Sequence, residues 1–432
     1  MSKNFLITIL LLFLLTACKE ASNLLHKTIV NKPQNSKKSI LALKACKLNK
    51  AMSIVNNENQ NSLLKNSELG LGNYFNNNYI VSNKHLDIAI NEYRNNEDKA
   101  IFDISTFLKK EYQIEGYDKV LLHNYKAINY LLLGDAEAAR VEAKNSNIIQ
   151  YREREKLNKF KKENSKKNQN TQLYSRYEKL FNHVNAEHNP FQNPFAYYIS
   201  ALAYAEDKDY ENALIDIEKA KKFFPNTEVL TRKQKIYENK EDNKSIELFF
   251  DIGQAPLKSQ VALKLDIGNG ETRTAYLPSF HLEISDVDYI CIKDNKGNEV
   301  ARTSLLVDIN AIKINAFKEK LPSMLYLISE QVTISLTSSK LNSNSKAVSG
   351  LFNAGAVIYG QNSTSTWSFL PQKTLVTSFI PKASEEYSMF VVSKNGETLD
   401  KKLLILGKYQ KTKNIYRHFN IPINKFCIKT NK

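Results

Sequence analysis

The feature that most limits how this chain can fold is a change of hydrophobic period near residue 240. Between about Ser39 and Tyr237, apolar residues recur every three or four positions, as in helices with one buried face. From about Ile246, short runs alternate apolar and polar residues between Gly, Asn and Asp turns, which predicts strands. The charged segment 238–244 separates the two patterns. The sequence therefore predicts an α+β chain with a helical domain followed by a C-terminal mixed α/β domain.

The helical domain, expected over residues 39–240, contains units with the spacing of tetratricopeptide repeats. In such units two antiparallel helices approach closely where a small residue faces a bulky one. The matching positions, from the clearest unit to the weakest, are Tyr197, Ser200, Ala201, Tyr204, Ala213, Ile217 and Pro225; then Ala127, Tyr130, Ala139 and Ala143; then Gly70, Ser82, Leu86 and Ala89. We expect a tetratricopeptide-like α-solenoid with an insertion at 152–189. A generic helical bundle whose alanines match by chance is the alternative.

The C-terminal domain, expected over residues 246–432, is predicted to hold a small antiparallel sheet with one or two helices. The turn sequences at 268–270 and 294–297 lie between alternating runs, which is typical of hairpins. The apolar spacing predicts a helix over 308–321. Further strands are expected over three segments: 375–380, 387–392 and 402–406.

The start of the chain predicts a secretory signal. Residues 5–15 form an apolar run that is shorter than the roughly 20 apolar residues of a spanning helix. The run ends in Leu15-Thr16-Ala17-Cys18, which resembles the lipobox of bacterial lipoproteins. An ordinary secretory signal that happens to contain a cysteine is the alternative.

The lipobox resemblance implies a membrane anchor. Leu15, Thr16 and Ala17 are expected to be recognised by the signal peptidase, and Cys18 is expected to carry the lipid. Residues 1–17 would then be removed, and 18–38 would form a lipid-anchored tether. The next residue is Lys19, not the Asp that holds some lipoproteins at the inner membrane. We therefore expect a lipid-anchored protein of the outer membrane, facing the periplasm.

Charge and cysteine content restrict the remaining possibilities. The formal net charge is +16, which favours attraction to anionic partners or reflects a Lys-rich composition, since the charges are scattered. Nucleic acid is not an expected partner of an exported, lipid-anchored chain. Cys46, Cys291 and Cys427 remain besides Cys18, so these three residues can form at most one disulfide, and the sequence leaves its pairing open.

Several strings together resemble a family of uncharacterised proteobacterial lipoproteins with tetratricopeptide repeats and a β-rich C-terminal region. They are Gly116-Tyr117-Asp118, residues 121–135, residues 138–143, Asn193-Pro194-Phe195-Ala196, residues 209–213, Gly253-x-x-Pro256-x-Lys258 and Thr366-Trp367-x-x-Leu370-Pro371. The resemblance covers roughly residues 60–420. Asn73 departs from it, because an aromatic residue is usual there. The resemblance implies an architecture and a location, but no catalytic residues.

No catalytic constellation is evident, and we expect no enzyme activity, cofactor, metal or small-molecule substrate. The chain lacks a Walker loop, a GxSxG elbow and an HExxH motif. His183, Glu187 and His188 are the nearest approach to a metal-ligand set, but only His183 and Glu187 have the spacing to share a helix face. Trp367 is expected to anchor the core of the C-terminal domain, with a carbohydrate-stacking surface as the alternative.

The remaining prediction is binding of another protein in a groove formed by the stacked helices. The candidate groove residues are Asn124, Lys126, Tyr130, Arg140, Tyr197 and Tyr204. Tyrosine and asparagine supply contact area and adaptable hydrogen bonds, and the two cations favour acidic or C-terminal carboxylate groups. The sequence thus favours a non-enzymatic adaptor that holds envelope proteins near the membrane. The alternatives are a peptidoglycan- or lipopolysaccharide-binding module, a surface-exposed virulence lipoprotein and an enzyme of unrecognised type.

Overall fold

The computed structural model describes residues 28–31, 37–58, 61–97, 112, 114–164, 192–241, 244–268, 271–319, 364–382, 386–406 and 414–427. Apart from the short strand β1 and a helix at 309–319, the described helices come first and the strands follow. The last helix of the first half, α11, ends at Glu238, and the next strand, β2, begins at Ile246. The chain is therefore of the mixed α+β class that the change of hydrophobic period predicts.

Nine labelled helices make up the helical part of the described chain. They are α2 (Lys37–Lys44), α3 (Leu48–Asn57), α4 (Ser62–Phe75), α5 (Tyr79–Glu97), α6 (Gly116–Leu133), α7 (Ala136–Asn164), α9 (Pro194–Glu206), α10 (Tyr210–Lys221) and α11 (Glu228–Glu238). Each packs against the next along the chain. Short turns join several neighbours, which makes these pairs helical hairpins.

Local sequence explains where several helices begin and end. The side chain of Asn193 accepts hydrogen bonds from the backbone N–H groups of Phe195 and Ala196, and Pro194 occupies the first turn of α9. Gly134 ends α6 in the left-handed region, with φ at +80°. Helix α7 continues without a break to Asn164, through the first part of the predicted insertion at 152–189. The rest of that insertion, 165–189, lies outside the described residues.

Small residues lie at equivalent positions in three helix pairs. In α4–α5, a Cβ added to Gly70 would lie 2.6 Å from Cδ2 of Leu86, and the Ser82 hydroxyl donates to the Gly70 carbonyl at 2.7 Å. The corresponding small residues of the other two pairs are all fully buried: Ala127, Ala139, Ala201 and Ala213. Close approach of the helices in each pair therefore depends on the absence of larger side chains there.

The strands form three sheets. They are β1 (Thr28–Asn31), β2 (Ile246–Ile252), β3 (Leu257–Gly268), β4 (Glu271–His281), β5 (Val287–Lys293), β6 (Glu299–Arg302), β7 (Ser304–Asp308), β8 (Lys373–Phe379), β9 (Tyr387–Ser393), β10 (Thr398–Leu404) and β11 (Ile415–Ile421). The strand orders are β1-β3-β4, β10-β9-β5-β6 and β11-β2-β8-β7. The prediction of one small antiparallel sheet was wrong: the described residues form three sheets, and β11 pairs with β2 in parallel.

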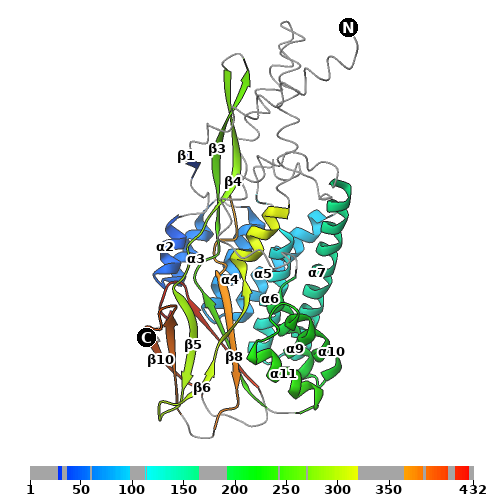
Figure 1. The fold of residues 1–432 in the computed structure, drawn as a ribbon, viewed down its shortest axis with the longest axis vertical. Coiled ribbons are helices and arrows are strands. Elements are labelled where there is room, and N and C mark those ends of the chain that lie inside the picture. Colours follow the sequence, from blue (N-terminus) through cyan, green and yellow to red (C-terminus); the bar gives the residue numbers. More distant parts are fainter. Residues whose placement is uncertain are drawn as a thin grey trace.

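The sheet β11-β2-β8-β7 is the middle of three layers. All seven residues of β2 are buried, because its two faces meet different neighbours. Phe249 belongs to the core shared with the helices, whereas Leu248 and Phe250 belong to a core shared with β5, β9 and β10. The layers are thus helices, a first sheet and a second sheet. In Figure 1 the helices α9, α10 and α11 lie to the right of the strands β5, β8 and β10.

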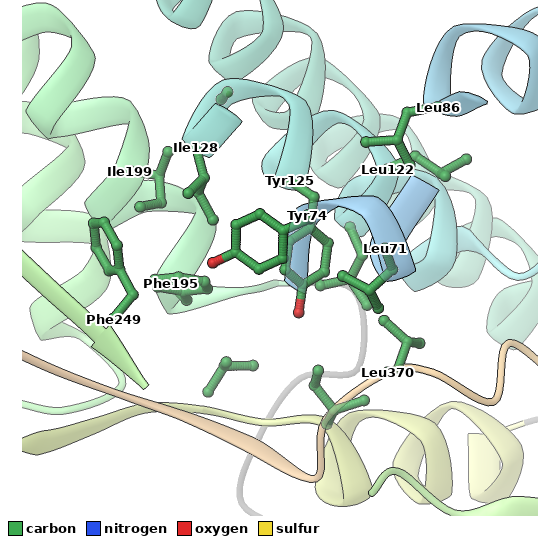
Figure 2. Close-up of a cluster of buried hydrophobic side chains, with 14 of the residues drawn as sticks. Leu71, Tyr74, Leu86, Leu122, Tyr125, Ile128, Phe195, Ile199, Phe249 and Leu370 are labelled. Carbon is green, nitrogen blue, oxygen red and sulfur yellow. The ribbon is translucent and has the colours of Figure 1, made fainter. Parts of the chain in front are cut away.

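The helices and the middle sheet share one continuous hydrophobic core. In Figure 2 the rings of Tyr74 on α4 and Tyr125 on α6 lie side by side, with Phe195 and Phe249 near them, and the two ring centres are 5.1 Å apart. The segment 364–372 also enters this core, where Trp367 and Leu370 are fully buried. The helix at 309–319 packs into the same core through Ile309, Ile312 and Ala316.

The third sheet is a long hairpin that projects beyond the helices (Figure 1). Strands β3 and β4 pair from Leu257 and His281 outward, and the first strand, β1, adds to β3 with Thr28 opposite Ala262. The end of the predicted tether, residues 18–38, therefore includes a strand and the start of α2.

Candidate functional site

The structure separates the six predicted groove residues into two groups. Asn124, Lys126 and Tyr197 are buried, with exposed fractions of 1%, 5% and 7%. Tyr130, Arg140 and Tyr204 are at least partly exposed. The six side chains therefore do not line one common groove.

Lys126 is part of an internal charge network. Its ammonium group lies 2.6 Å from Oε1 of Glu142 and 2.5 Å from Oδ1 of Asp87. It also lies 5.8 Å above the centre of the Tyr130 ring. Burial opposes the charge of Lys126, but the two carboxylates hold its pKa above its ordinary value. Lys126 is therefore a structural cation that joins α5, α6 and α7, and it is not available to a partner.

His123 extends the same network into the core. Its Nδ1 lies 2.5 Å from Oε2 of Glu142, and its Nε2 lies 2.9 Å from the Tyr93 hydroxyl. Because the Glu142 carboxylate only accepts hydrogen bonds, Nδ1 carries a proton. Burial lowers the pKa of His123. The chain from Tyr93 to Glu142 has the composition of a proton relay, but all three residues are buried. It therefore holds helices together and offers no contact to a substrate in this structure.

The other predicted residues lie around α7, α9 and α10. Arg140 forms an ion pair with Asp207 at 3.0 Å, which ties α7 to the end of α9. The Lys219 ammonium lies 5.5 Å from the centre of the Tyr197 ring, and burial raises the pKa of that tyrosine. Tyr204 alone among the six lines the groove described next.

A groove of about 390 Å³ lies between α7 and α10, with the end of α9 contributing to it. Its lining residues are Lys144, Asn147, Ile148, Tyr151 and Arg152 from α7, Tyr204 from α9, and Asn212, Ile215, Asp216 and Lys219 from α10. Lys144, Ile148 and Arg152 follow one another at four-residue intervals, so they form one stripe along α7. Ile215 is exposed on α10, on another wall of the groove.

The only carboxylate in the lining is already fully engaged. Oδ2 of Asp216 accepts from the Ser200 hydroxyl at 2.6 Å and from the Asn147 amide at 3.1 Å, while Oδ1 accepts from Lys219 at 2.8 Å. Asp216 is buried, and its bonds fix α10 against α7 and α9. The base of the groove is therefore rigid and its negative charge is neutralised locally.

Lys144 and Arg152 differ from the other cations of this region. Both are exposed, and neither forms a hydrogen bond or an ion pair within the part of the chain that the structure describes. The adjacent Arg154, in contrast, is paired with Glu155 at 3.6 Å. Among the described residues, the groove thus presents two positive charges without a counter-charge on one wall.

A second group of ionisable side chains is sealed between the layers. Both carboxylate oxygens of Glu68 accept hydrogen bonds from the segment 364–372: Ser368 donates through its N–H and hydroxyl, and Phe369 through its N–H. Burial raises the pKa of Glu68 to about 7 and lowers that of Lys313 to about 8. Asp118, also buried, accepts from the Tyr112 hydroxyl at 3.0 Å. These residues join layers and have no exposed surface for a ligand to reach.

Trp367 and the cysteines also occupy defined places. Trp367 is fully buried, so it cannot act as a carbohydrate-stacking surface, and the cell-wall-binding alternative loses the side chain that motivated it. Cys46 and Cys427 form a disulfide, and Cys291 is free and buried. The pairing that the sequence left open is therefore Cys46–Cys427.

Other sequence predictions fall outside the described residues. These include the lipobox residues Leu15, Thr16, Ala17 and Cys18, and the histidines His183 and His188. Within the described residues, no group of three potential metal ligands comes together. Among the helices described, none combines the length and the apolarity that crossing a bilayer requires.

Comparisons of the chain with protein-family models, with curated proteins and with solved structures found no match. The resemblance to lipoproteins with tetratricopeptide repeats therefore stays a prediction.

Sequence reasoning missed four residues that define the groove: Lys144, Ile148, Arg152 and Ile215. A signal for three of them was present, because a cation, an apolar residue and a cation recur at four-residue spacing on α7. Ile215 carried no comparable signal, since only the packing of α10 beside α7 places it at the groove.

Proposed function

We propose that this protein is a lipid-anchored adaptor of the cell envelope that binds another protein through its helical part. The observation that carries the proposal is the groove between α7 and α10. It combines exposed apolar side chains with two cations that have no counter-charge in the described part of the chain, over a base fixed by the hydrogen bonds of Asp216. A surface of this kind is suited to a protein segment.

The pattern of helix pairs supports the same proposal. Buried small residues recur at equivalent positions in α4–α5, α6–α7 and α9–α10, as expected for tetratricopeptide-like units. Stacked helix pairs create extended surfaces that commonly serve recognition. The finer assignment to an α-solenoid of this type is part of the proposal.

Location outside the cytoplasm has separate support. The Cys46–Cys427 disulfide is the kind of bond that persists in oxidising compartments such as the periplasm. The lipobox ending at Cys18 is the expected point of attachment to the membrane. We place the protein at the outer membrane, facing the periplasm.

Fractionation of cells that express the full chain tests the anchor. The wild-type protein should sediment with membranes and resist carbonate extraction, and Cys18→Ser should release it into the soluble fraction. Unchanged fractionation of Cys18→Ser would remove the anchor from the proposal. Photo-crosslinking from the helical surface in intact cells, described below, tests the adaptor role.

A further inference from the structure

We infer that the α7–α10 groove binds an amphipathic helix of a partner protein in which one apolar side chain is flanked by acidic residues. The inference rests on the proposed adaptor function and names the chemistry of the partner. It depends on three properties of the groove: exposed apolar groups, two cations that no described residue pairs, and the spacing of these side chains.

The apolar contact surface comes from two facing helices. Ile148 and Tyr151 on α7 are 39% and 59% exposed, and Ile215 on α10 is 48% exposed. All three line the same groove. Single exposed apolar residues are ordinary on protein surfaces, but a group of them around one hollow indicates a contact site. The groove volume of about 390 Å³ accommodates a few side chains and not a folded domain.

The charges select an acidic ligand. The lining holds three cations, Lys144, Arg152 and Lys219, but Asp216 is its only carboxylate. Asp216 and Lys219 are bonded to each other, which leaves Lys144 and Arg152 without a counter-charge among the described residues. A partner carboxylate beside each cation would gain charge-assisted contacts, whereas a basic segment would be repelled.

The spacing indicates a helical partner. Lys144 and Arg152 are eight residues apart, which corresponds to about 12 Å along α7. Ile148 lies midway between them. A helix running alongside α7 presents acidic, apolar and acidic side chains with the same separation when they occur at positions i, i+4 and i+8. The four-residue spacing on α7 therefore matches the four-residue spacing on a partner helix, and this match is the geometric basis of the proposal.

Binding of defined peptides tests this chemistry directly. The probe is a fluorescent, alanine-based 17-residue peptide with Glu at positions 5 and 13 and Leu at position 9, and its matched control has Lys in place of both Glu. Fluorescence anisotropy should detect the acidic peptide, with an affinity that decreases as salt concentration rises. Equal affinity for the acidic and the basic peptide would overturn the inference.

Charge reversal in the protein provides the matched variants. Lys144→Glu with Arg152→Glu should weaken binding of the acidic peptide by at least about tenfold and create binding of the basic peptide. Gain of a new specificity cannot result from unfolding. The control pair, Lys50→Glu on α3 with Lys84→Glu on α5, makes the same charge change at other exposed sites and should leave both affinities unchanged. If both double variants lost the same affinity for the acidic peptide, binding would not depend on a local site at the groove.

Photo-crosslinking in cells separates this inference from the proposed function. The crosslinker p-benzoylphenylalanine replaces Ile148, Ile215 or, as a control on α5, the exposed Ile88. Crosslinks from positions 148 and 215 to another protein, through an acidic segment, are the expected result. Crosslinks to a partner from position 88 alone would show that the partner binds elsewhere. That result would overturn this inference but would be compatible with the proposed adaptor function. Crosslinks only within the chain itself would mean that its own residues fill the groove, which also overturns the inference. The absence of any intermolecular crosslink would reject the adaptor function and this inference with it.

Discussion

Cys46, in the turn between α2 and α3, is joined by a disulfide to Cys427, 381 positions later in the chain. The bond fastens the first helical hairpin to the segment that follows the last strand of the middle sheet. Two segments that are far apart in the sequence are therefore held to the same body. Because the helices and this sheet also share a core, the disulfide reinforces contacts that already cross the layers.

Loss of this disulfide should lower stability without abolishing the fold. We expect Cys46→Ala with Cys427→Ala to reduce the free energy of unfolding by about 2–5 kcal/mol, because the cross-link restricts the unfolded chain. Thermal unfolding under non-reducing conditions measures the change. Cys291→Ala is the matched control, since it removes the buried free thiol and keeps the disulfide. A reductant should destabilise Cys291→Ala but leave the double variant unaffected.

Lys233 on α11 and Glu247 on β2 form an ion pair that is almost completely buried. Glu247 also accepts hydrogen bonds from Tyr198 at 2.6 Å and from Ser378 at 2.8 Å, so it connects two helices with two strands. Replacing Glu247 with Leu leaves the ammonium group buried, with the Ser245 hydroxyl as its one remaining partner among the described residues. We expect a loss of about 3–5 kcal/mol in the free energy of unfolding.

The double variant Lys233→Met with Glu247→Leu is the decisive comparison for this pair. It removes both charges together, so its loss should be smaller than that of Glu247→Leu alone. Urea unfolding of the single and double variants measures the difference. Additive losses would show that the two residues do not stabilise each other.

Features that depend on neighbouring residues could be predicted from the sequence. The cap at Asn193, the helix end at Gly134 and the hairpin turn at 294–297 all follow from local backbone preferences. The long hairpin β3–β4 was likewise evident from alternation on both sides of its turn. The transition from helix to strand near residue 240 was correct for the same reason.

Features that depend on distant residues could not be predicted in this way. The two faces of β2 meet different layers, so its sequence is apolar without clear alternation, and its parallel neighbour β11 comes far later in the chain. Lys126 appears to be a surface cation until Glu142 and Asp87 are brought to it by helix packing. The groove was missed for the same reason, because α10 must pack beside α7 before Ile148 and Ile215 line one surface.

Stability should decrease as pH rises from about 4.5 to about 7 because of Glu68. Burial raises its pKa to about 7 in the folded protein, from an ordinary value of 4.5. Between these values the folded state binds a proton that the unfolded state has lost, so the contribution of Glu68 is present below 4.5 and disappears as pH passes 7. The total is roughly 3 kcal/mol by the standard conversion. Glu68→Gln should flatten this part of the pH profile.

The measurement is chemical unfolding of the wild type and of Glu68→Gln between about pH 4.5 and pH 7. Asp251, whose pKa burial also raises to about 7, contributes to both profiles and cancels in their difference. The exposed Glu218→Gln is the control and should retain the wild-type profile. Parallel profiles for wild type and Glu68→Gln would mean that Glu68 does not titrate in this range.

The contact between Gly70 and Leu86 tests whether the helix pairs depend on small residues. A Cβ at Gly70 would lie 2.6 Å from Cδ2 and 2.8 Å from Cγ of Leu86, both atoms of a fully buried side chain. Gly70→Ala should therefore cost about 1–3 kcal/mol despite the better helix propensity of alanine. Leu86→Ala alone should cost about 2–5 kcal/mol through the cavity that it leaves.

In the double variant, the new methyl group occupies part of that cavity. The loss of stability in the double variant should therefore be smaller than the sum of the two single losses. Urea unfolding of the wild type, the two single variants and the double variant measures the difference. If the two losses add, Gly70 and Leu86 do not compete for the same space, and the close approach of α4 and α5 has another cause.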